Sequence, residues 1–210
     1  MSVAIRRAGE GDRADVVRLL DAAFLHDPVS SWVFPGEEHR LRTHAALMNA
    51  FFDLALAEGH VDLTEDGTAV ALWWSVPADT HQDDDGAQTQ DTEEDGPAML
   101  RRAVDPDNER VELIGRLTDA IHPTDRPHEY LHLIAVHPDH QGRGLGTGLV
   151  AAVLDRCDRE GRHAYLEASN RRSRDLYARL GFAFTGETLD LPDGPRMWPM
   201  WREPLETVLR

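Results

Sequence analysis

The strongest constraint on the fold is a glycine-rich loop, Gln141-Gly142-Arg143-Gly144-Leu145-Gly146, between an apolar strand and a helix. The apolar run from Tyr130 to Val136 predicts the strand, and the apolar stripe from Val150 to Cys157 predicts a helix that ends near Glu160. Glycines allow unusual backbone angles and leave no Cβ between the backbone and a ligand. Free amides at a helix start, with the positive end of its dipole, bind anions. The loop therefore predicts a site for a phosphate or pyrophosphate.

Two common phosphate-binding motifs do not fit this loop. A P-loop requires Lys-Ser/Thr after its last glycine, and no lysine follows here. A Rossmann fingerprint requires Gly-x-Gly-x-x-Gly directly after the strand and an acidic residue about 20 positions later. Glu167 ends the next strand, but Gly142-x-Gly144-x-Gly146 has a different spacing and begins well after Val136.

The loop instead resembles the Gln/Arg-x-x-Gly-x-Gly/Ala signature of the GNAT (Gcn5-related) N-acetyltransferases. The preceding run from Leu133 to Pro138 is similar to that family's fourth strand, and Asn170 with Tyr177 resembles its second conserved block. The resemblance covers about Tyr130 to Phe182. It implies an α/β (α+β) fold with a mixed central sheet of about six to seven strands flanked by helices. Strands four and five of that fold splay around acyl-CoA.

The resemblance implies direct transfer of an acetyl group from acetyl-CoA, used as a cosubstrate, to the primary amine of a small molecule or peptide. The alternative is a non-catalytic acyl-CoA-binding or regulatory relative. The residues that the resemblance implies as cofactor-binding are Ile134, Ala135, Val136, Gln141, Gly142, Arg143, Gly144, Leu145, Gly146, Thr147, Asn170 and Tyr177.

Three residues are predicted to be catalytic. Tyr177 matches the family tyrosine that protonates the departing thiolate, although a core tyrosine would show the same pattern. His132 and Glu129, on the predicted fourth strand, are the predicted bases for the incoming amine, and Glu167 is a further candidate. A packed strand histidine is the alternative for His132. The alternative to cofactor binding for Asn170 is that it caps a helix. The alternative for Arg143 is that it is a solvent-facing loop side chain.

Aromatic residues are candidates for lining an acceptor pocket. They are Trp32, Trp73, Trp74 and Tyr130. Adjacent strand residues point to opposite faces, so at most one of Trp73 and Trp74 would do so.

Two further patterns bear on substrate and metal. The sequence around Pro138–Gly142 and the segment Gly194–Trp198 resemble the puromycin N-acetyltransferase branch of the family. The sequence at Asn170 and its neighbours differs from that branch. That substrate is not carried over. His137 and His140 lack a further clear set of ligands, so no metal is expected.

Composition limits the partners. The chain of 210 residues holds 38 acidic and 22 basic residues, a formal net charge of −16, which disfavours nucleic acid and anionic membranes and favours cationic ligands. The single cysteine, Cys157, excludes an intramolecular disulfide. Signal-peptide and membrane-spanning patterns are absent from the sequence, which predicts a cytoplasmic protein. Dimers are common in the family, so a homodimer is compatible with the resemblance.

The chain length predicts a single domain over 1–210, with an acidic insertion at about 77–97. Periodicity and turn signals predict the remaining elements. Helices are expected at 12–24, 37–57, 99–120 (interrupted near Pro106) and 171–180, and strands at 3–6, 60–64, 69–76, 164–168, 182–187 and 197–201.

Overall fold

The computed structural model describes residues 3–78 and 95–205, so most of the predicted acidic insertion lies outside the described residues. The strands are β1 (Ile5–Arg7), β2 (Gly59–Thr64), β3 (Ala69–Val76), β4 (His128–Val136), β5 (His163–Ala168), β6 (Ala183–Phe184), β7 (Leu189–Asp190) and β8 (Arg196–Arg202). The helices are α1 (Arg13–Phe24), α2 (Pro28–Val33), α3 (Glu37–Glu58), α4 (Gly96–Val104), α5 (Glu109–Asp119), α6 (Leu145–Glu160) and α7 (Arg171–Arg179).

The strands form one mixed sheet in the order β1-β2-β3-β4-β5-β8-β6, with β7 also paired to β8. Only the β4–β5 pair is parallel among the described pairs. The long connection between these two strands contains α6, as a parallel crossover requires. The predicted α/β fold with a mixed sheet is confirmed, with eight described strands where about six to seven were expected.

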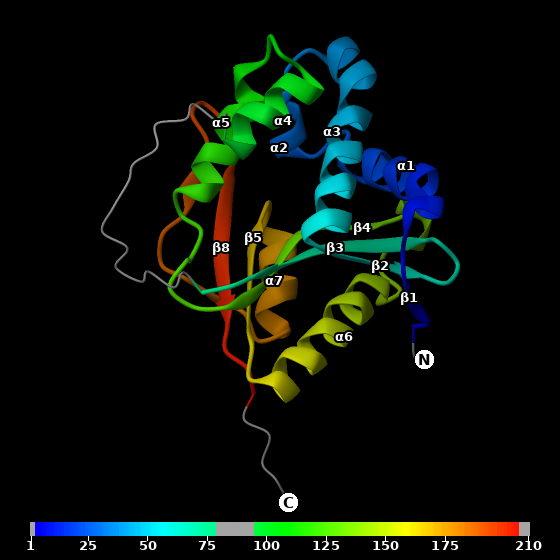
Figure 1. The fold of residues 1–210 in the computed structure, drawn as a ribbon, viewed down its shortest axis with the longest axis vertical. Coiled ribbons are helices and arrows are strands. Elements are labelled where there is room, and N and C mark those ends of the chain that lie inside the picture. Colours follow the sequence, from blue (N-terminus) through cyan, green and yellow to red (C-terminus); the bar gives the residue numbers. More distant parts are fainter. Residues whose placement is uncertain (1–2, 79–94, 206–210) are drawn as a thin grey trace, which may run out of the picture.

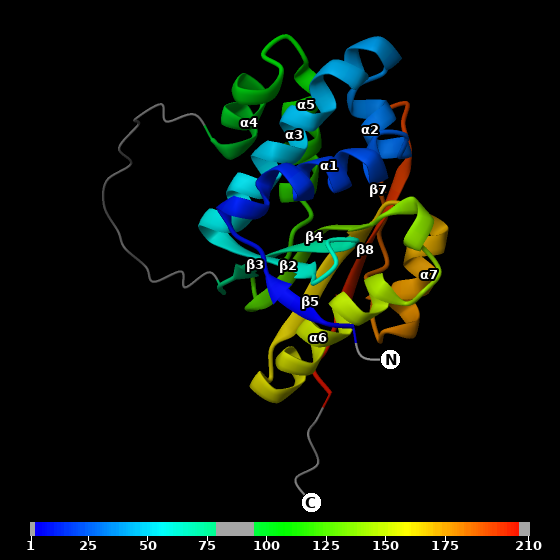
Figure 2. The ribbon, with the colours of Figure 1, turned by 90° about the vertical axis from the view of Figure 1, so that its right-hand side faces the viewer.

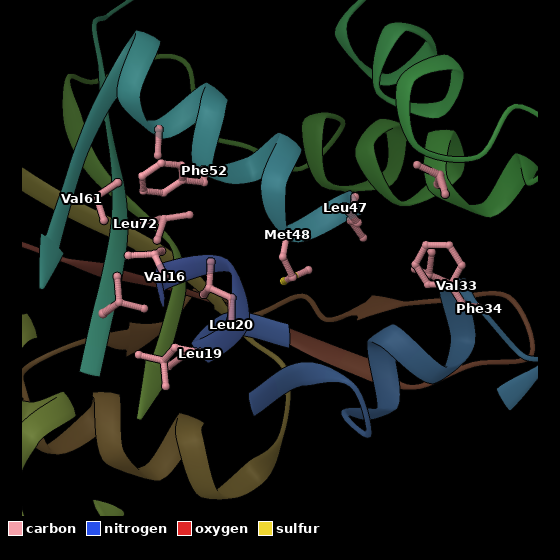
Figure 3. Close-up of a cluster of buried hydrophobic side chains, with 14 of the residues drawn as sticks. Val16, Leu19, Leu20, Val33, Phe34, Leu47, Met48, Phe52, Val61 and Leu72 are labelled. Atoms are coloured by element: carbon pink, nitrogen blue, oxygen red, sulfur yellow. The ribbon is translucent and has the colours of Figure 1, made fainter. Parts of the chain in front are cut away.

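Helices cover both faces of the sheet (Figures 1 and 2). On one face α1 and α3 pack on β2, β3 and part of β4, α2 and α4 pack on α3, and α5 packs on α2 and α4. A cluster including Leu20, Phe52 and Leu72 is buried there (Figure 3). On the other face α6 and α7 cover a second cluster that includes Trp73, Leu149 and Leu166. The alternation along β3 produces this division, since Leu72 and Trp73 belong to different clusters.

The segment after α1 differs from the prediction. His26-Asp27-Pro28 ends α1 as expected, but α2 starts again at once at Pro28. The Asp27 carboxylate accepts a hydrogen bond from the Val29 amide at 2.8 Å and caps this second helix. Proline at the first helical position loses no hydrogen bond there, so the residue that stops one helix starts another. Near the C-terminus the predicted strand 182–187 is also wrong in length, since β6 holds only Ala183 and Phe184.

β4 and β5 separate along their length. They pair only from His128 to Tyr130 on β4 and from His163 to Tyr165 on β5. Beyond Tyr130, β4 continues beside β3 to Val136, while β5 stays with β8. The backbone edges that face each other past this point are therefore not joined by a ladder, which leaves room between the two strands. The expected splaying of strands four and five is confirmed.

A β-bulge lies in β4 at His132. Leu131 pairs with Trp73 and Leu133 pairs with Leu72, so His132 is the extra residue without a partner on β3. Leu131 consequently packs with the α6 cluster while Leu133 packs with the α3 cluster, although the two residues are two positions apart. A bulge re-aims side chains in this way. It turns His132 toward Phe51 of α3, with 4.5 Å between the ring centroids.

Candidate active site

A cavity of about 680 Å³ opens where β4 and β5 part. This volume lies in the range of small-molecule sites in proteins. Its central wall is the part of β4 that does not pair with β5, Leu131 to Val136, together with Leu166 and Glu167 of β5. One side is lined by the glycine-rich loop and by α7, and we call it the donor half. The other side is lined by residues of α1 to α5, and we call it the acceptor half.

The glycine-rich loop forms one end of the donor half. Gly142 and Gly144 have φ angles of 76° and 81°, in the left-handed region that glycine adopts without strain. Gly144 caps α6, and the first intrahelical bond runs from the Gly148 amide to the Gly144 carbonyl at 2.8 Å. The amides of Leu145, Gly146 and Thr147 therefore have no carbonyl partner within the helix. They present an anion-binding end toward the cavity, which these three residues line.

Gly146 lies where the start of α6 passes β4. A Cβ at this position would lie 3.4 Å from Val136 Cγ2 and 3.6 Å from Ile134 Cδ1. Ile134, Ala135 and Val136 all line the cavity beside this helix start. The structure therefore requires glycine for the left-handed turns at Gly142 and Gly144, whereas a Cβ at Gly146 would make ordinary van der Waals contacts with β4.

α7 forms the other wall of the donor half. Asn170 caps this helix, since its Oδ1 accepts a hydrogen bond from the Ser173 amide at 2.9 Å. The alternative function of Asn170 as a helix cap therefore applies to its Oδ1 atom. Asn170 also lines the cavity. Tyr177 lies further along the same helix, seven residues after Asn170. It is 6% exposed and also lines the cavity. Burial raises the pKa of the Tyr177 phenol, so it keeps its proton at neutral pH and is a hydrogen-bond donor.

Three polar side chains form a chain across the centre of the cavity. The Tyr130 hydroxyl donates to Glu167 Oε2 at 2.7 Å, and His132 Nδ1 lies 3.2 Å from the same hydroxyl oxygen. Because Tyr130 uses its proton toward Glu167, His132 Nδ1 is the donor to Tyr130, which fixes the imidazole tautomer. His132 Nε2 and Glu167 Oε1 are buried without a hydrogen-bond partner. Each therefore has a free lone pair, and both residues line the cavity.

The two side chains differ in basicity. Burial raises the pKa of Glu167 to about 7, against the lowering effect of the hydrogen bond from Tyr130. Burial lowers the pKa of His132 to about 3, with a smaller contribution from His122. His132 is therefore neutral and a weak base at neutral pH, whereas Glu167 titrates within the physiological range. Of the predicted bases, Glu167 has the electrostatics that suit proton transfer from an amine.

Glu129 is not brought into the cavity. Its carboxylate is 2% exposed and lies on the α6 side of the sheet, where Arg156 and Arg162 bind it at 3.2 and 3.1 Å. Ser75 also donates to it at 2.8 Å. The reason is strand alternation: Glu129 and Tyr130 point to opposite faces, and of these two residues Tyr130 lines the cavity and Glu129 does not. Position on the fourth strand was therefore an insufficient guide to this residue.

Several other predicted residues also lie outside the lining. Arg143 donates to the Asp139 carbonyl at 3.0 Å and is exposed. Trp32 donates to the Pro192 carbonyl at 2.7 Å. Trp73 and Trp74 lie on opposite faces as expected, and neither lines the cavity, although Trp74 packs on His132 at 4.2 Å between ring centroids.

The acceptor half contains residues that the sequence did not single out. Asp27 lines it and is half-buried, and burial raises the pKa of its carboxyl. The Ser169 hydroxyl lies 3.4 Å from Asp27 Oδ2 and joins the α1–α2 junction to the end of β5. An acidic residue before proline is an N-cap signal. Nothing local in the sequence indicates that this cap also lines a cavity with the end of β5, more than a hundred residues later in the chain.

Within residues 3–78 and 95–205, no group of three or more His, Cys, Asp or Glu side chains is arranged to hold a metal ion. No helix in these residues is long and apolar enough to cross a membrane. Cys157 is buried in the α6 cluster, and burial raises the pKa of its thiol to about 11, so it is a core side chain.

Comparison with known proteins identifies the family. The model of the acetyltransferase (GNAT) family matches residues 68–182, more than half of the chain. The chain belongs to this family. It is 40% identical over 63 residues to the L-amino acid N-acyltransferase MnaT of Escherichia coli, an alignment that covers 29% of this chain and 37% of that protein.

A second relative is the L-methionine sulfoximine/L-methionine sulfone acetyltransferase of Salmonella typhimurium, 41% identical over 59 residues, or 27% of this chain and 34% of that protein. The matches thus span about a third of the length of these curated relatives. Among solved structures, a Corynebacterium glutamicum protein described as histone acetyltransferase HPA2 and related acetyltransferase is similar over 100% of both chains, with a TM-score of 0.72 and 24% identity. This similarity is one of fold.

Proposed function

We propose that the protein is an acetyl-CoA-dependent N-acetyltransferase that acts on a primary amine. The observation that carries the proposal is the gap between β4 and β5, which joins the free amides at the start of α6 to the buried carboxylate of Glu167 in one cavity. Family membership supports acyl transfer to an amine. The proposal includes acetyl-CoA as the donor, the roles assigned to individual residues below, and a homodimeric state.

The donor half suits acetyl-CoA. The amides of Gln141 to Thr147 and the positive end of α6 would hold the pyrophosphate, and no acidic residue lies in the first turn of this helix. The extended pantetheine arm of acetyl-CoA would lie in the gap beside Ile134, Ala135 and Val136. The edge of these residues toward β5 has no strand partner. Backbone amides on this edge are suited to polarise the thioester carbonyl. Asn170 would contact the arm through its Nδ2 group, since its Oδ1 caps α7.

Glu167 and Tyr177 would supply the proton transfers. Glu167 would accept a proton from the ammonium group of the acceptor, which frees the nitrogen lone pair to form the C–N bond at the acetyl carbon. As the C–S bond breaks, Tyr177 would donate its phenolic proton to sulfur. The nitrogen would lose its second proton to the Tyr177 phenolate, which restores the phenol, and Glu167 would release its proton to solvent. Tyr130 and His132 would act as positioning residues, because they orient the Glu167 carboxylate and leave Oε1 free.

The test is CoA thiol release from acetyl-CoA in the presence of a panel of amines. The panel holds puromycin-like nucleosides, aminoglycosides, polyamines, amino acids, short peptides and simple aralkyl amines. We expect release that depends on the added amine and that falls at least about 100-fold in Glu167→Gln. Acetyl-CoA binding by calorimetry without amine-dependent release from any member would support the non-catalytic alternative. Absence of both would refute the proposal.

A further inference from the structure

The acceptor half of the cavity is predominantly apolar. Five helices contribute to it, with side chains that include Phe24, Val33, Leu47, Phe51, Leu100 and Ile114. Such a wall favours a ligand with an apolar body, because burying apolar surface on both partners releases it from water. Its acidic groups are the Asp27 carboxylate, near Ser30 and Ser169, and the Glu167 carboxylate at the boundary with the donor half. Thr118, Tyr130 and His132 are further polar residues of the lining.

The basic residues near this wall have other partners. The chain contains no lysine, so arginine is its only permanently charged cationic side chain. Arg40 is buried and donates to the Phe34 carbonyl at 2.7 Å. Arg110 donates to the Trp32 carbonyl at 2.7 Å, and Arg116 pairs with Asp95 and Glu112.

The charge of the cavity is therefore divided between its halves. Among the described lining residues, the arginines are Arg172 and Arg179, and both come from α7 in the donor half. The segment 79–94, which lies outside the described residues, is acidic in sequence and contains no arginine. An ammonium group entering the acceptor half would meet Asp27 and Glu167, while a carboxylate there would meet no cationic partner among the described residues.

We propose that the acceptor is a primary amine on an uncharged apolar body, such as an aralkyl or long alkyl amine, and that free amino acids are poor substrates. This inference rests on the proposed function and specifies its substrate class. Burying a carboxylate without a cationic partner is strongly unfavourable, and two acidic side chains add repulsion. The relatives named for L-amino acids and for L-methionine derivatives would thus differ from this protein in the acceptor they take.

The test compares three amines that share one aromatic body: phenethylamine, L-phenylalanine and L-phenylalaninamide. The amide replaces the carboxylate by a neutral group of similar size. We expect kcat/KM for phenethylamine and for the amide to exceed that for L-phenylalanine by about 100-fold or more at pH 8, the order expected for an unpaired buried charge. A value for L-phenylalanine within threefold of phenethylamine would overturn the inference and leave the proposed function intact. Absence of thiol release with all three and with the broader panel would refute the proposed function itself.

A pair of variants at one lining position provides the protein-side test. Ile114→Arg adds a cation to the acceptor half, and Ile114→Met is its uncharged control of flexible shape. We expect Ile114→Arg to raise the ratio of kcat/KM for L-phenylalanine over phenethylamine by at least about tenfold relative to Ile114→Met. Acetyl-CoA affinity, measured on both variants, reports that the fold and the donor half are retained. An unchanged ratio in two folded variants would show that charge at this wall does not select the acceptor.

Discussion

Replacing Glu167 by Gln should slow the enzyme and stabilise the protein at the same time. The carboxyl keeps its proton in the folded state up to about pH 7, whereas the unfolded carboxyl loses it near 4.5. Between these values the folded state binds more protons, so stability falls as pH rises. The shift corresponds to about 3 kcal/mol at pH 8 and to less than about 1 kcal/mol at pH 5. Glutamine has no charge to desolvate, and its amide oxygen still accepts from Tyr130.

The assay is urea denaturation of the wild type and Glu167→Gln at pH 5 and pH 8, with Glu187→Gln as the control at an exposed position. We expect the variant to gain on the order of 3 kcal/mol over the wild type at pH 8 and little at pH 5. The control should show no such dependence. Thiol release should fall by about 100-fold or more in the variant. In the wild type, kcat/KM should decline about tenfold per pH unit below pH 7, because the protonated carboxyl accepts no proton.

Two results would refute this reasoning. Equal stability of the wild type and Glu167→Gln at pH 8 would mean that the carboxylate is not held at a desolvation cost. Full activity of the variant, with a wild-type pH profile, would remove Glu167 from proton transfer. A loss of activity with no pH-dependent gain in stability would separate the two claims, since it keeps the catalytic role and rejects the buried-charge explanation.

Three further predictions concern the donor half and the core. Tyr177→Phe should lower kcat by about 100-fold while the dissociation constant of acetyl-CoA changes by less than about threefold, as thiol release and calorimetry would report; an unchanged kcat excludes the acid role. Gly144→Val places a branched side chain at a φ of 81° and should weaken acetyl-CoA binding by about tenfold, because the loop must leave the conformation that directs its amides toward the pyrophosphate. Unchanged affinity would count against this position of the pyrophosphate. Phe52→Ala, at a position with 0% exposure, should cost about 3–5 kcal/mol of unfolding free energy by urea denaturation, whereas Phe184→Ala, at 43% exposure, should cost less than about 1 kcal/mol. Similar losses in both phenylalanine variants would contradict the assigned core.

Local sequence signals determined much of the secondary structure. Amphipathic stripes predicted α1 and α3 to within about one residue, and the alternation of turn residues and apolar runs predicted β2 and β3. The conformation of the glycine-rich loop was also predictable, because its backbone angles and the helix start lie within a few residues of one another. These features follow from interactions over short sequence distances.

The choice of the base required the tertiary structure. Glu129 and Glu167 both lie on strands beside the predicted donor site, and the sequence gives no means to rank them by environment. Pairing of β4 with β5 buries Glu129 between two arginines of the α6 face and places Glu167 against Tyr130 at the point where the strands part. The bulge at His132 adds a change of face that no periodic pattern could indicate.

The sequence by itself determined the family and the donor loop, since both are carried by contiguous residues with fixed local geometry. Only the tertiary structure decided the acceptor half, because its wall is assembled from α1 to α5 and meets β5 across more than a hundred residues of chain. The electrostatics of that wall depend on which arginines are already bound elsewhere, such as Arg40 and Arg110 at backbone carbonyls. A pKa or a selectivity is a property of such surroundings, and surroundings form only when distant segments pack together.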